Sequence, residues 1–436
     1  MTAAAATSGT STLPVPPGLI LRPFRALRYR EASQERMAAR TSPPYDVVDE
    51  SGRCALEAAD PHNVVQLILP RDAENGGSCY RHAAELLEAW QQDGVLAADA
   101  EPALYVYEIE LGGHVQRGLL GAVGLAQPED EIILPHENTM AGPVADRLAL
   151  IEATGANLEP IFLVYDGGGA ASAAVARADA VEPLLNFATP DGAHHRLWAL
   201  TDSATLEQIA ADLQPRRAVI ADGHHRYATY LQYQRRRHEA GDGPGPWDFG
   251  LSFLVDAQAF GPQVHAIHRA VPSLPVAEAA SRAAQGFAVR EIPGGVDAAV
   301  GELAAAREKG TAFALTAAGP QAPAYLLTDP DGAALNEALP AGHSAAWNGL
   351  DVSIAHAFLI RALWDVADNE QTVLYQHDVE AAVRAAGSDG TALLLNPTPV
   401  EAVAAVAAAG DRMPRKSTLF TPKPRTGIAL RLLSHG

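Results

Sequence analysis

The stretch VIADGHHRYATYL, residues 219–231, places an Asp-Gly pair between an apolar run and a run that favours a helix. The apolar run predicts a buried strand, and the residues from Arg226 onward predict a helix. A strand that enters a helix through Gly223 leaves main-chain N–H groups directed at an anion. Asp222 can cap such a helix, and Arg226 can offer two parallel N–H groups to phosphate oxygens. The stretch therefore predicts an α/β arrangement with an anion site at the turn.

Three interpretations of this stretch stay open: an anion site, a capped helix start with solvated histidines, and a metal site. Adjacent residues such as His224 and His225 do not face the same way on a helix, so a metal pair is poorly built. A helical zinc site would place histidines four residues apart with a glutamate, a spacing that this stretch lacks. Similar letters, DGAHHRLW at residues 191–198, lead into a strand pattern, and we interpret that copy as structural.

Composition narrows the class of protein. The 436 residues include 52 acidic and 32 basic side chains, giving a net charge of −20, which argues against a nucleic-acid partner. No apolar run reaches the length that spans a bilayer, so no membrane association is expected. The two cysteines, Cys54 and Cys79, lack CxxC spacing and favour a reducing cytoplasm.

Strand-like and helix-like runs alternate along the chain, which predicts a mixed α/β fold with two lobes. Residues 1–18 have the composition of a disordered tail. The Gly- and Pro-rich run GDGPGPWDFG, residues 241–250, is the expected linker, so that the lobes span residues 19–240 and 241–436. The apolar run HNVVQLIL, residues 62–69, predicts a buried strand.

Three further motifs carry polar side chains that suit chemistry. PHENTMAGPVADR, residues 135–147, sets a His-Glu pair in a turn, where it could polarise a hydroxyl, hold a metal, or simply face solvent. MPRKSTLFTPKPRTG, residues 413–427, gathers basic and hydroxyl groups on a Pro-framed loop that suits oxyanions, without P-loop spacing. DGGGAAS, residues 166–172, imitates a nucleotide-binding glycine turn only weakly.

These motifs, taken in order, resemble a known family. The blocks SPPYDVV, LPHENT, DRLALIEATGANLEPIFLVY, IADGHHRYATYL, HAIHR and MPRKSTLFTPKPRTG look like those of the domain-of-unknown-function 1015 family, from about Pro23 to Leu432. The resemblance implies a free L-serine kinase that makes O-phosphoserine, with pyrophosphate or ADP/ATP as the donor. The DGHHR block is similar to the phosphate-binding motif of the ParB/sulfiredoxin-like fold, which implies a core of that kind.

The resemblance also implies roles for individual residues. Glu137 is the candidate base for the serine hydroxyl, Asp222 is its rival, and His136 is a further catalytic candidate. The residues expected to bind phosphate are Gly223, His224, His225, Arg226, His268, Arg269, Arg415, Lys416, Ser417 and Thr418. The residues expected to bind substrate are Tyr45, Asp46 and Arg147.

Mg²⁺ is expected to arrive with the phosphoryl donor, and no metal site is assigned to protein side chains. Two departures from the family pattern, Pro135 before the His-Glu pair and HAIHR at residues 265–269, could alter the choice of donor or acceptor. The alternatives are a ParB-like nucleotide-binding regulator without catalysis, and a phosphotransferase or hydrolase that acts on another hydroxylated metabolite. A homodimer is one option for the assembly.

Overall fold

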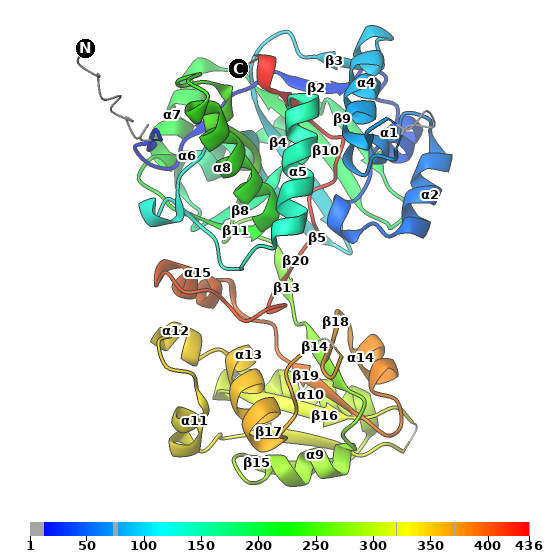
Figure 1. Cartoon of the computed structure of the whole chain (residues 1–436), viewed down its shortest axis with the longest axis vertical. Coiled ribbons are helices and arrows are strands. Elements are labelled where there is room, and N and C mark those ends of the chain that lie inside the picture. Colours follow the sequence, from blue (N-terminus) through cyan, green and yellow to red (C-terminus); the bar gives the residue numbers. More distant parts are fainter. Residues whose placement is uncertain (1–12, 73–76, 320, 370, 436) are drawn as a thin grey trace, which may run out of the picture. The chain divides into compact units, whose positions relative to one another are not determined.

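The chain forms two compact units in the computed structural model, which describes residues 13–72, 77–319, 321–369 and 371–435 (Figure 1). The first unit comprises residues 1–135, 139–262 and 422–436, and the second comprises residues 136–138 and 263–421. The first twelve residues of the predicted tail lie outside the described residues. The predicted mixed α/β fold is confirmed, because both units combine sheets with helices.

A nine-stranded sheet forms the centre of the first unit. Its strands lie in the order β6 (Ile133–Leu134), β11 (Ala218–Asp222), β8 (Ile161–Tyr165), β12 (Phe249–Asp256), β5 (His114–Gly124), β4 (Leu104–Leu111), β10 (His194–Leu200) and β9 (Leu185–Ala188), with β1 (Leu21–Arg22) paired to β5. β8 runs parallel to β12 and antiparallel to β11, so the sheet is mixed. Its central strands are buried along their length, which requires cover on both faces.

A smaller four-stranded sheet joins distant parts of the first unit's sequence. Its order is β3 (Leu96–Ala98), β2 (Ala26–Tyr29), β21 (Leu430–Leu432) and β7 (Ala156–Asn157). The C-terminal strand β21 lies between β2 and β7 and pairs antiparallel with both. The segment after residue 421 is therefore an integral part of the first unit.

The helices of the first unit are α1 (Gln34–Arg40), α2 (Glu50–Ala59), α3 (Val65–Ile68), α4 (Cys79–Gln92), α5 (Ala141–Thr154), α6 (Gly169–Ala176), α7 (Ser203–Leu213) and α8 (His224–Glu239). The strand predicted for residues 62–69 is wrong, because this stretch contains the short helix α3. Val65, Leu67 and Ile68 are all buried there, and a short apolar run that is buried all round has no periodicity to separate helix from strand.

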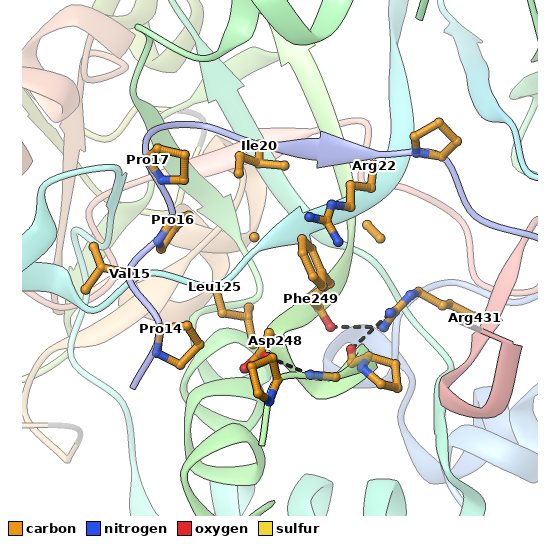
Figure 2. Close-up of a pocket in the computed structure, with 16 residues that line it drawn as sticks. Pro14, Val15, Pro16, Pro17, Ile20, Arg22, Leu125, Asp248, Phe249 and Arg431 are labelled. Carbon is orange, nitrogen blue, oxygen red and sulfur yellow. Dashed lines mark hydrogen bonds between the residues drawn. The ribbon is translucent and has the colours of Figure 1, made fainter. Parts of the chain in front are cut away.

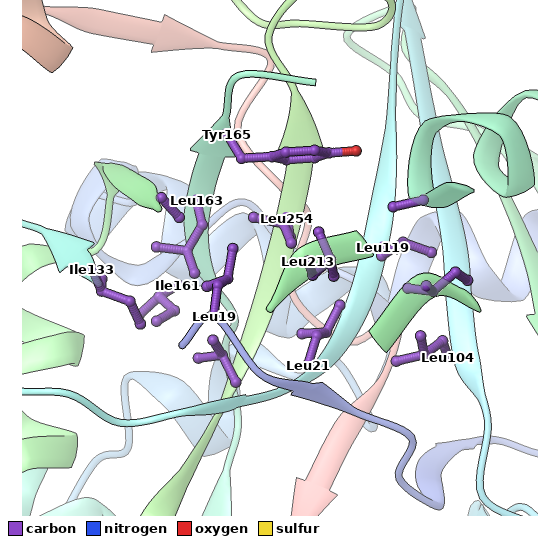
Figure 3. Packing of buried hydrophobic residues seen from close by; sticks show 14 of the residues in the cluster. Leu19, Leu21, Leu104, Leu119, Ile133, Ile161, Leu163, Tyr165, Leu213 and Leu254 are labelled. Atoms are coloured by element: carbon purple, nitrogen blue, oxygen red, sulfur yellow. The ribbon is translucent and has the colours of Figure 1, made fainter. Parts of the chain in front are cut away.

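Leucine, isoleucine and aromatic side chains fill the core of the first unit (Figure 3). Leu19 and Leu21 from the N-terminal segment contact the same cluster as Ile161 and Leu163 of β8 and Leu213 of α7. Burial of large side chains of this kind contributes about 1.5–3 kcal/mol each. The N-terminal segment is thus fixed to the main sheet by its leucines.

The second unit contains a six-stranded antiparallel sheet with an alanine-rich core. Its strands lie in the order β15 (Ala288–Ile292), β17 (Ala324–Thr328), β16 (Ala312–Thr316), β19 (Thr391–Leu395), β14 (His268–Val271) and β18 (Leu374–Gln376). Its helices are α9 (Val276–Ala283), α10 (Gly295–Ala306), α11 (Gly332–Ala338), α12 (Ala345–Asn348), α13 (Asp351–Ile354), α14 (Val379–Ala386) and α15 (Val400–Ala408). A separate pair, β13 (Gln263–His265) and β20 (Leu419–Thr421), sets Gln263 opposite Thr421.

A π-helical segment, Ala355–Leu363, continues directly from α13. The Trp364 amide donates to the Leu359 carbonyl at 2.9 Å, a step of five residues instead of four. Helices of this wide form are rare and occur often at functional sites. No sequence signal predicted this segment.

The division into units differs from the predicted boundary after residue 240. The run at residues 241–250 is a loop that leads from α8 into β12, a central strand of the first unit's sheet. The first unit instead continues to Pro262 and resumes at Pro422. Glycine and proline mark the end of a helix equally well inside a domain and between domains, so composition placed the boundary too early.

In the described part of the chain no helix has the length and apolar character needed to cross a membrane.

Candidate active site

The turn between β11 and α8 is built as its sequence predicts. Gly223 alone separates the strand from the helix, and its φ of 93° lies in the left-handed region that favours glycine. The N-cap residue of α8 is Gly223, which has no side chain that could cap the helix, so Asp222 does not occupy the N-cap position. The first N–H groups of a helix have no partner within the helix, so they are suited to binding an anion.

Arg226 reaches back from the first turn of α8 to Asp222. Its Nη2 donates to Asp222 Oδ2 at 2.5 Å, and its Nη1 donates to the Pro160 carbonyl. Arg226 is only 4% exposed, and its Nε has no hydrogen-bond partner within the described part of the chain. Burial alone would lower the pKa of Arg226, but Asp222, Glu159 and Asp46 raise it, so the guanidinium stays charged.

Lys423 joins Asp222 to Asp46. Its Nζ lies 2.6 Å from Asp222 Oδ1 and 2.7 Å from Asp46 Oδ2. Burial opposes charge on Lys423 and on Asp46, but the attraction between opposite charges outweighs it: the pKa of Lys423 is raised and that of Asp46 is lowered. Both oxygens of Asp222 therefore accept hydrogen bonds from cations, one from Lys423 and one from Arg226.

Glu159 provides a further buried carboxylate in this group. Its Oε1 accepts hydrogen bonds from the Tyr45 amide at 3.0 Å and from Thr426 Oγ1 at 3.2 Å. Arg147 Nη1 lies 3.8 Å from Oε2. Burial raises the pKa of Glu159, and the charges of Arg226 and Arg147 offset only part of that rise.

Arg147 and Tyr45 complete the group. The Arg147 guanidinium lies over the Tyr45 ring at 4.3 Å and donates to the Ile68 carbonyl at 2.5 Å. Burial raises the pKa of Tyr45 to about 12, so its hydroxyl stays protonated at neutral pH. The first-unit cluster, as we call it, comprises Tyr45, Asp46, Arg147, Glu159, Asp222, Arg226 and Lys423.

The structure thus brings the three predicted substrate residues together with Asp222 and Arg226. The remaining histidines of the motif lie beside them at the start of α8: His225 Nε2 accepts a hydrogen bond from the Met140 amide at 3.1 Å, and His224 is buried. Two members of the first-unit cluster, Glu159 and Lys423, were not among the predicted site residues. Their signals were a carboxylate beside the apolar run PIFLVY and a lysine within the Pro-framed loop.

The other predicted residues lie in the second unit. His136 Nε2 lies 3.1 Å from Thr418 Oγ1, and the His136 carbonyl accepts from the Met413 amide at 2.8 Å. The His-Glu pair and the hydroxyl loop are therefore in contact. Glu137, the next residue, is half-buried, and Ser417 donates its hydroxyl to the Pro414 carbonyl. The roles predicted for these residues remain predictions.

His268 and Arg269 are held by main-chain contacts. His268 Nδ1 accepts a hydrogen bond from the Leu395 amide, and burial lowers its pKa to about 4. Arg269 donates to the carbonyls of Ile267 and Lys416 and, through Nε, to His356 Nε2 at 3.0 Å. Arg269 is 1% exposed, and burial lowers its pKa to about 10. The Arg269 nitrogens that could donate to a phosphate therefore already donate to groups of the chain.

The glycine turn at residues 166–172 is filled by the chain itself. The Asp256 carboxylate accepts from the Gly168 amide at 3.1 Å and from Ser172 Oγ at 2.5 Å. Asp212 accepts from the Ala171 amide at 2.9 Å. The N–H groups of this turn that a nucleotide phosphate would use therefore already donate to carboxylates of the chain. This agrees with the weak match of residues 166–172 to a nucleotide-binding motif.

The first unit contains a cavity of about 440 Å³, and six of its sixteen lining residues are prolines (Figure 2). Arg431 donates there to the carbonyls of Phe249 and Pro246, and Asp248 accepts from the Gly245 amide. The Arg22 guanidinium lies over the Phe249 ring at 4.2 Å. Main-chain carbonyls thus bind the two terminal nitrogens of Arg431, and the other charged lining residues are Arg22, which lies over a ring, and Asp248.

Comparison with known proteins identifies the family. Residues 21–353 match the family described as "protein of unknown function (DUF1015)", and the chain belongs to that family. None of the curated proteins matches the sequence.

Solved structures with similar arrangements include a free serine kinase variant in complex with ADP, at 14% identity and a TM-score of 0.33 over 70% of this chain and 90% of that one. A C-terminally truncated SbnI from Staphylococcus aureus is similar at 11% identity and a TM-score of 0.34, over 72% and 87% of the two chains. A conserved hypothetical protein from Pyrococcus furiosus is similar at 16% identity and a TM-score of 0.32, over 74% and 98%. At these values the likeness bears on neither substrate nor mechanism, which have to be argued from this chain's own residues.

Proposed function

We propose that the protein is a small-molecule kinase that transfers a phosphoryl group to the hydroxyl of free L-serine and makes O-phosphoserine. The donor in this proposal is pyrophosphate, ADP or ATP. The observation that supports it is the glycine turn before α8, where Arg226 and Lys423 both bind Asp222. Main-chain N–H groups and two cations at one turn suit a polyphosphate.

The reaction in this proposal is governed by positioning and charge neutralisation. The serine oxygen forms a bond to the transferred phosphorus while the bond from phosphorus to the bridging oxygen of the donor breaks. The hydroxyl proton passes to a carboxylate, and the leaving group, which is phosphate from pyrophosphate, AMP from ADP or ADP from ATP, carries away the bonding electron pair. Such a transfer needs cations and N–H donors around the phosphoryl oxygens more than it needs covalent catalysis.

Two carboxylates are candidates for the base. Asp222 already accepts a hydrogen bond from a cation at each oxygen, which supports a role in holding Arg226 and Lys423. Glu137 is then the proposed base. Glu137→Gln is expected to lower kcat at least a hundredfold with little change in the donor KM, whereas Asp222→Asn is expected to raise the donor KM as well. Equal effects of the two substitutions on both constants would contradict this assignment.

Mg²⁺ enters the proposal only as a complex with the donor. Among the described residues no group of three or more His, Cys, Asp or Glu side chains is placed to hold a metal ion. Asp46 and Asp222 are bridged by the Lys423 ammonium, which occupies the place between them where a cation would bind. Because Mg²⁺ is commonly bound by phosphates and few protein ligands, it would serve here to neutralise the donor's charge.

The test is direct. Purified protein with Mg²⁺, L-serine and each donor in turn is expected to yield O-phosphoserine, observed by phosphorus NMR. Arg226→Lys is expected to lower kcat/KM at least a hundredfold, since a lysine cannot reproduce the guanidinium fork. Arg216→Lys is the matched control, because Arg216 pairs with Asp212 at the same four-residue spacing.

Three outcomes contradict the proposal. Folded protein that yields no product with any donor rules it out. Nucleotide binding without turnover favours the regulatory alternative, and turnover of another hydroxylated metabolite but not of serine favours the phosphotransferase alternative.

A further inference from the structure

The cavity of about 440 Å³ in the first unit is a second candidate for a ligand site (Figure 2). None of the seven residues of the first-unit cluster lines it. Its volume lies in the range of pockets that enclose small organic ligands. We call it the proline pocket, and the lining residues that bear on its ligand are Pro16, Ile20, Arg22, Gly124, Phe249 and Arg431.

Rigid and apolar side chains form most of the wall of the proline pocket. Pro16 and Ile20 belong to the N-terminal segment, and Phe249 is the first residue of β12. A proline ring loses no rotamer freedom when a ligand covers it, so burying it costs little conformational entropy. Such a wall favours a ligand with an apolar ring or chain.

Gly124 leaves space beside three of these lining residues. It is the last residue of β5 and lies opposite Phe249 in β12. A Cβ on Gly124 would lie 3.4 Å from Pro16 Cβ, 3.5 Å from Ile20 Cβ and 3.8 Å from Phe249 Cε1, all ordinary van der Waals distances. The φ of Gly124 is not positive, so the main chain does not require glycine here. A larger side chain at this position would therefore occupy part of the pocket.

Arg22 is the accessible cation of the proline pocket. Its side chain is exposed, and its guanidinium lies over the Phe249 ring at 4.2 Å (Figure 2). Across the residues that the structure describes, Arg22 has no side-chain hydrogen bond and no ion pair. A guanidinium without a carboxylate partner can bind a carboxylate through two parallel N–H groups.

The other charged lining residues are consistent with an anionic ligand. Asp248 Oδ1 accepts from His238 Nε2 at 2.7 Å, and Oδ2 accepts from the Gly245 amide at 2.8 Å. Arg431 is 1% exposed, pairs with no carboxylate of the described chain, and donates to main-chain carbonyls through both terminal nitrogens. Both oxygens of the single lining carboxylate are thus hydrogen-bonded, and Arg22 is the one lining arginine whose nitrogens a ligand can reach.

We propose that the proline pocket binds a small monocarboxylate, with its carboxylate on Arg22 and its apolar ring or chain against Pro16, Ile20 and Phe249. One accessible guanidinium suits a single carboxylate better than a phosphate, which carries more than one negative charge at pH 7. The apolar wall favours an acid with a ring or chain over acetate. The proposal goes beyond the serine kinase activity, because it concerns other residues and requires no phosphoryl transfer.

The test uses the full-length protein and calorimetric titration with three probes: phenylacetate, its neutral amide phenylacetamide, and acetate. Phenylacetate is expected to bind one to one. The other two probes should bind at least tenfold more weakly, because one lacks the charge and the other lacks the ring. Arg22→Gln is expected to weaken phenylacetate binding at least tenfold and to leave phenylacetamide binding unchanged. Arg81→Gln is the matched control, since Arg81 is an exposed arginine of the same unit that pairs with Glu85.

Gly124→Val tests the apolar half of the site without removing any group of the protein. Its methyl groups would extend into the space beside Pro16 and Phe249, so the binding of phenylacetate and of phenylacetamide should both weaken at least tenfold. Gly301→Val is the control, because Gly301 is exposed and nothing lies within 4 Å of a Cβ there. If Gly124→Val lowers the melting temperature, Gly124→Ala gives the same test with one methyl group and should weaken both probes in the same direction.

Several results would overturn the proposal. Phenylacetamide bound as tightly as phenylacetate removes the role of Arg22, and acetate bound as tightly removes that of the apolar wall. Phenylacetate binding that survives both Arg22→Gln and Gly124→Val, in proteins with unchanged melting temperature, places the ligand elsewhere. Failure of the unchanged protein to bind phenylacetate contradicts the proposal outright. None of these results depends on the outcome of the kinase assay.

Discussion

Lys423 is the residue on which the first-unit cluster depends most directly, because it lies between two buried carboxylates. Lys423→Met would leave Asp46 and Asp222 side by side with one positive charge fewer. Removing one partner of a buried ion pair costs about 3–5 kcal/mol. We expect urea unfolding to show a loss of that order, with Lys309→Met, at an exposed lysine, as the control. Equal losses for the two variants would contradict the bridging role.

We expect the folded protein to lose stability in acid because two of its histidines are buried. Burial lowers the pKa of His195 to about 3 and that of His268 to about 4. Since the unfolded chain binds these protons near pH 6.5 and the folded chain does not, stability is complete above pH 6.5 and falls as the pH drops toward 4. At pH 5 each histidine should cost about 2 kcal/mol.

The measurement compares urea unfolding at pH 7.5 and pH 5. His195→Asn removes contacts with Tyr107 and Thr189 and is expected to be less stable at pH 7.5. Its loss between the two pH values, however, should be smaller than that of the unchanged protein by about 2 kcal/mol. An identical loss would mean that His195 is protonated in the folded state.

At the scale of elements, the strand–glycine–helix turn makes Gly223→Ala informative. A Cβ at this position would lie 3.1 Å from Arg226 Nε, and the φ of 93° is unfavourable for alanine. Gly192, in the structural copy of the motif, has a φ of 86° and nothing within 4 Å of a Cβ. Both substitutions should cost about 1–3 kcal/mol from the backbone.

The difference in activity between the two variants measures the effect of displacing the Arg226 guanidinium, because the backbone cost is common to both. Gly223→Ala displaces Arg226 and is expected to lower the rate of serine phosphorylation at least tenfold more than Gly192→Ala does, at matched stability. Activity that follows melting temperature in the same way for both variants would show that the position of Arg226 is unimportant.

Local sequence pattern was sufficient for β11, Gly223 and α8, because each is specified by neighbours within a few residues. It was insufficient for α3, where burial on all sides removed the periodicity. It also could not identify Glu159 and Lys423, whose roles arise from contacts with Tyr45, Asp46 and Asp222 made only by the folded chain. The predicted substrate residues were found through the resemblance of their motifs, and the structure adds the contacts that join them.

At the scale of the whole molecule, the second unit is inserted almost entirely between Pro262 and Pro422 of the first. Because Gln263 pairs with Thr421, the ends of the insertion lie about 5 Å apart. Replacing residues 263–421 with a short Gly-Ser linker is therefore expected to leave a folded first unit. Circular dichroism and urea unfolding would test this.

The control is a chain that ends at residue 421. It lacks β21 and Lys423, and should lose the cooperative transition of the first unit. A linker-joined chain that unfolds as readily as this truncated chain would mean that the first unit requires the insertion.

The return of residues 422–435 to the first unit also sets an order of events during protein synthesis. A ribosome delivers the N-terminal residues first, and domains commonly begin to fold as they emerge. Here the strand that joins β2 to β7, and the lysine between Asp46 and Asp222, are translated only after residues 263–421 of the second unit. While the second unit is being synthesised, the nascent first unit lacks β21 in its small sheet, and no lysine yet lies between Asp46 and Asp222. A premature stop in translation near residue 421 would release a chain that lacks β21 and Lys423, and therefore lacks the cation between Asp46 and Asp222.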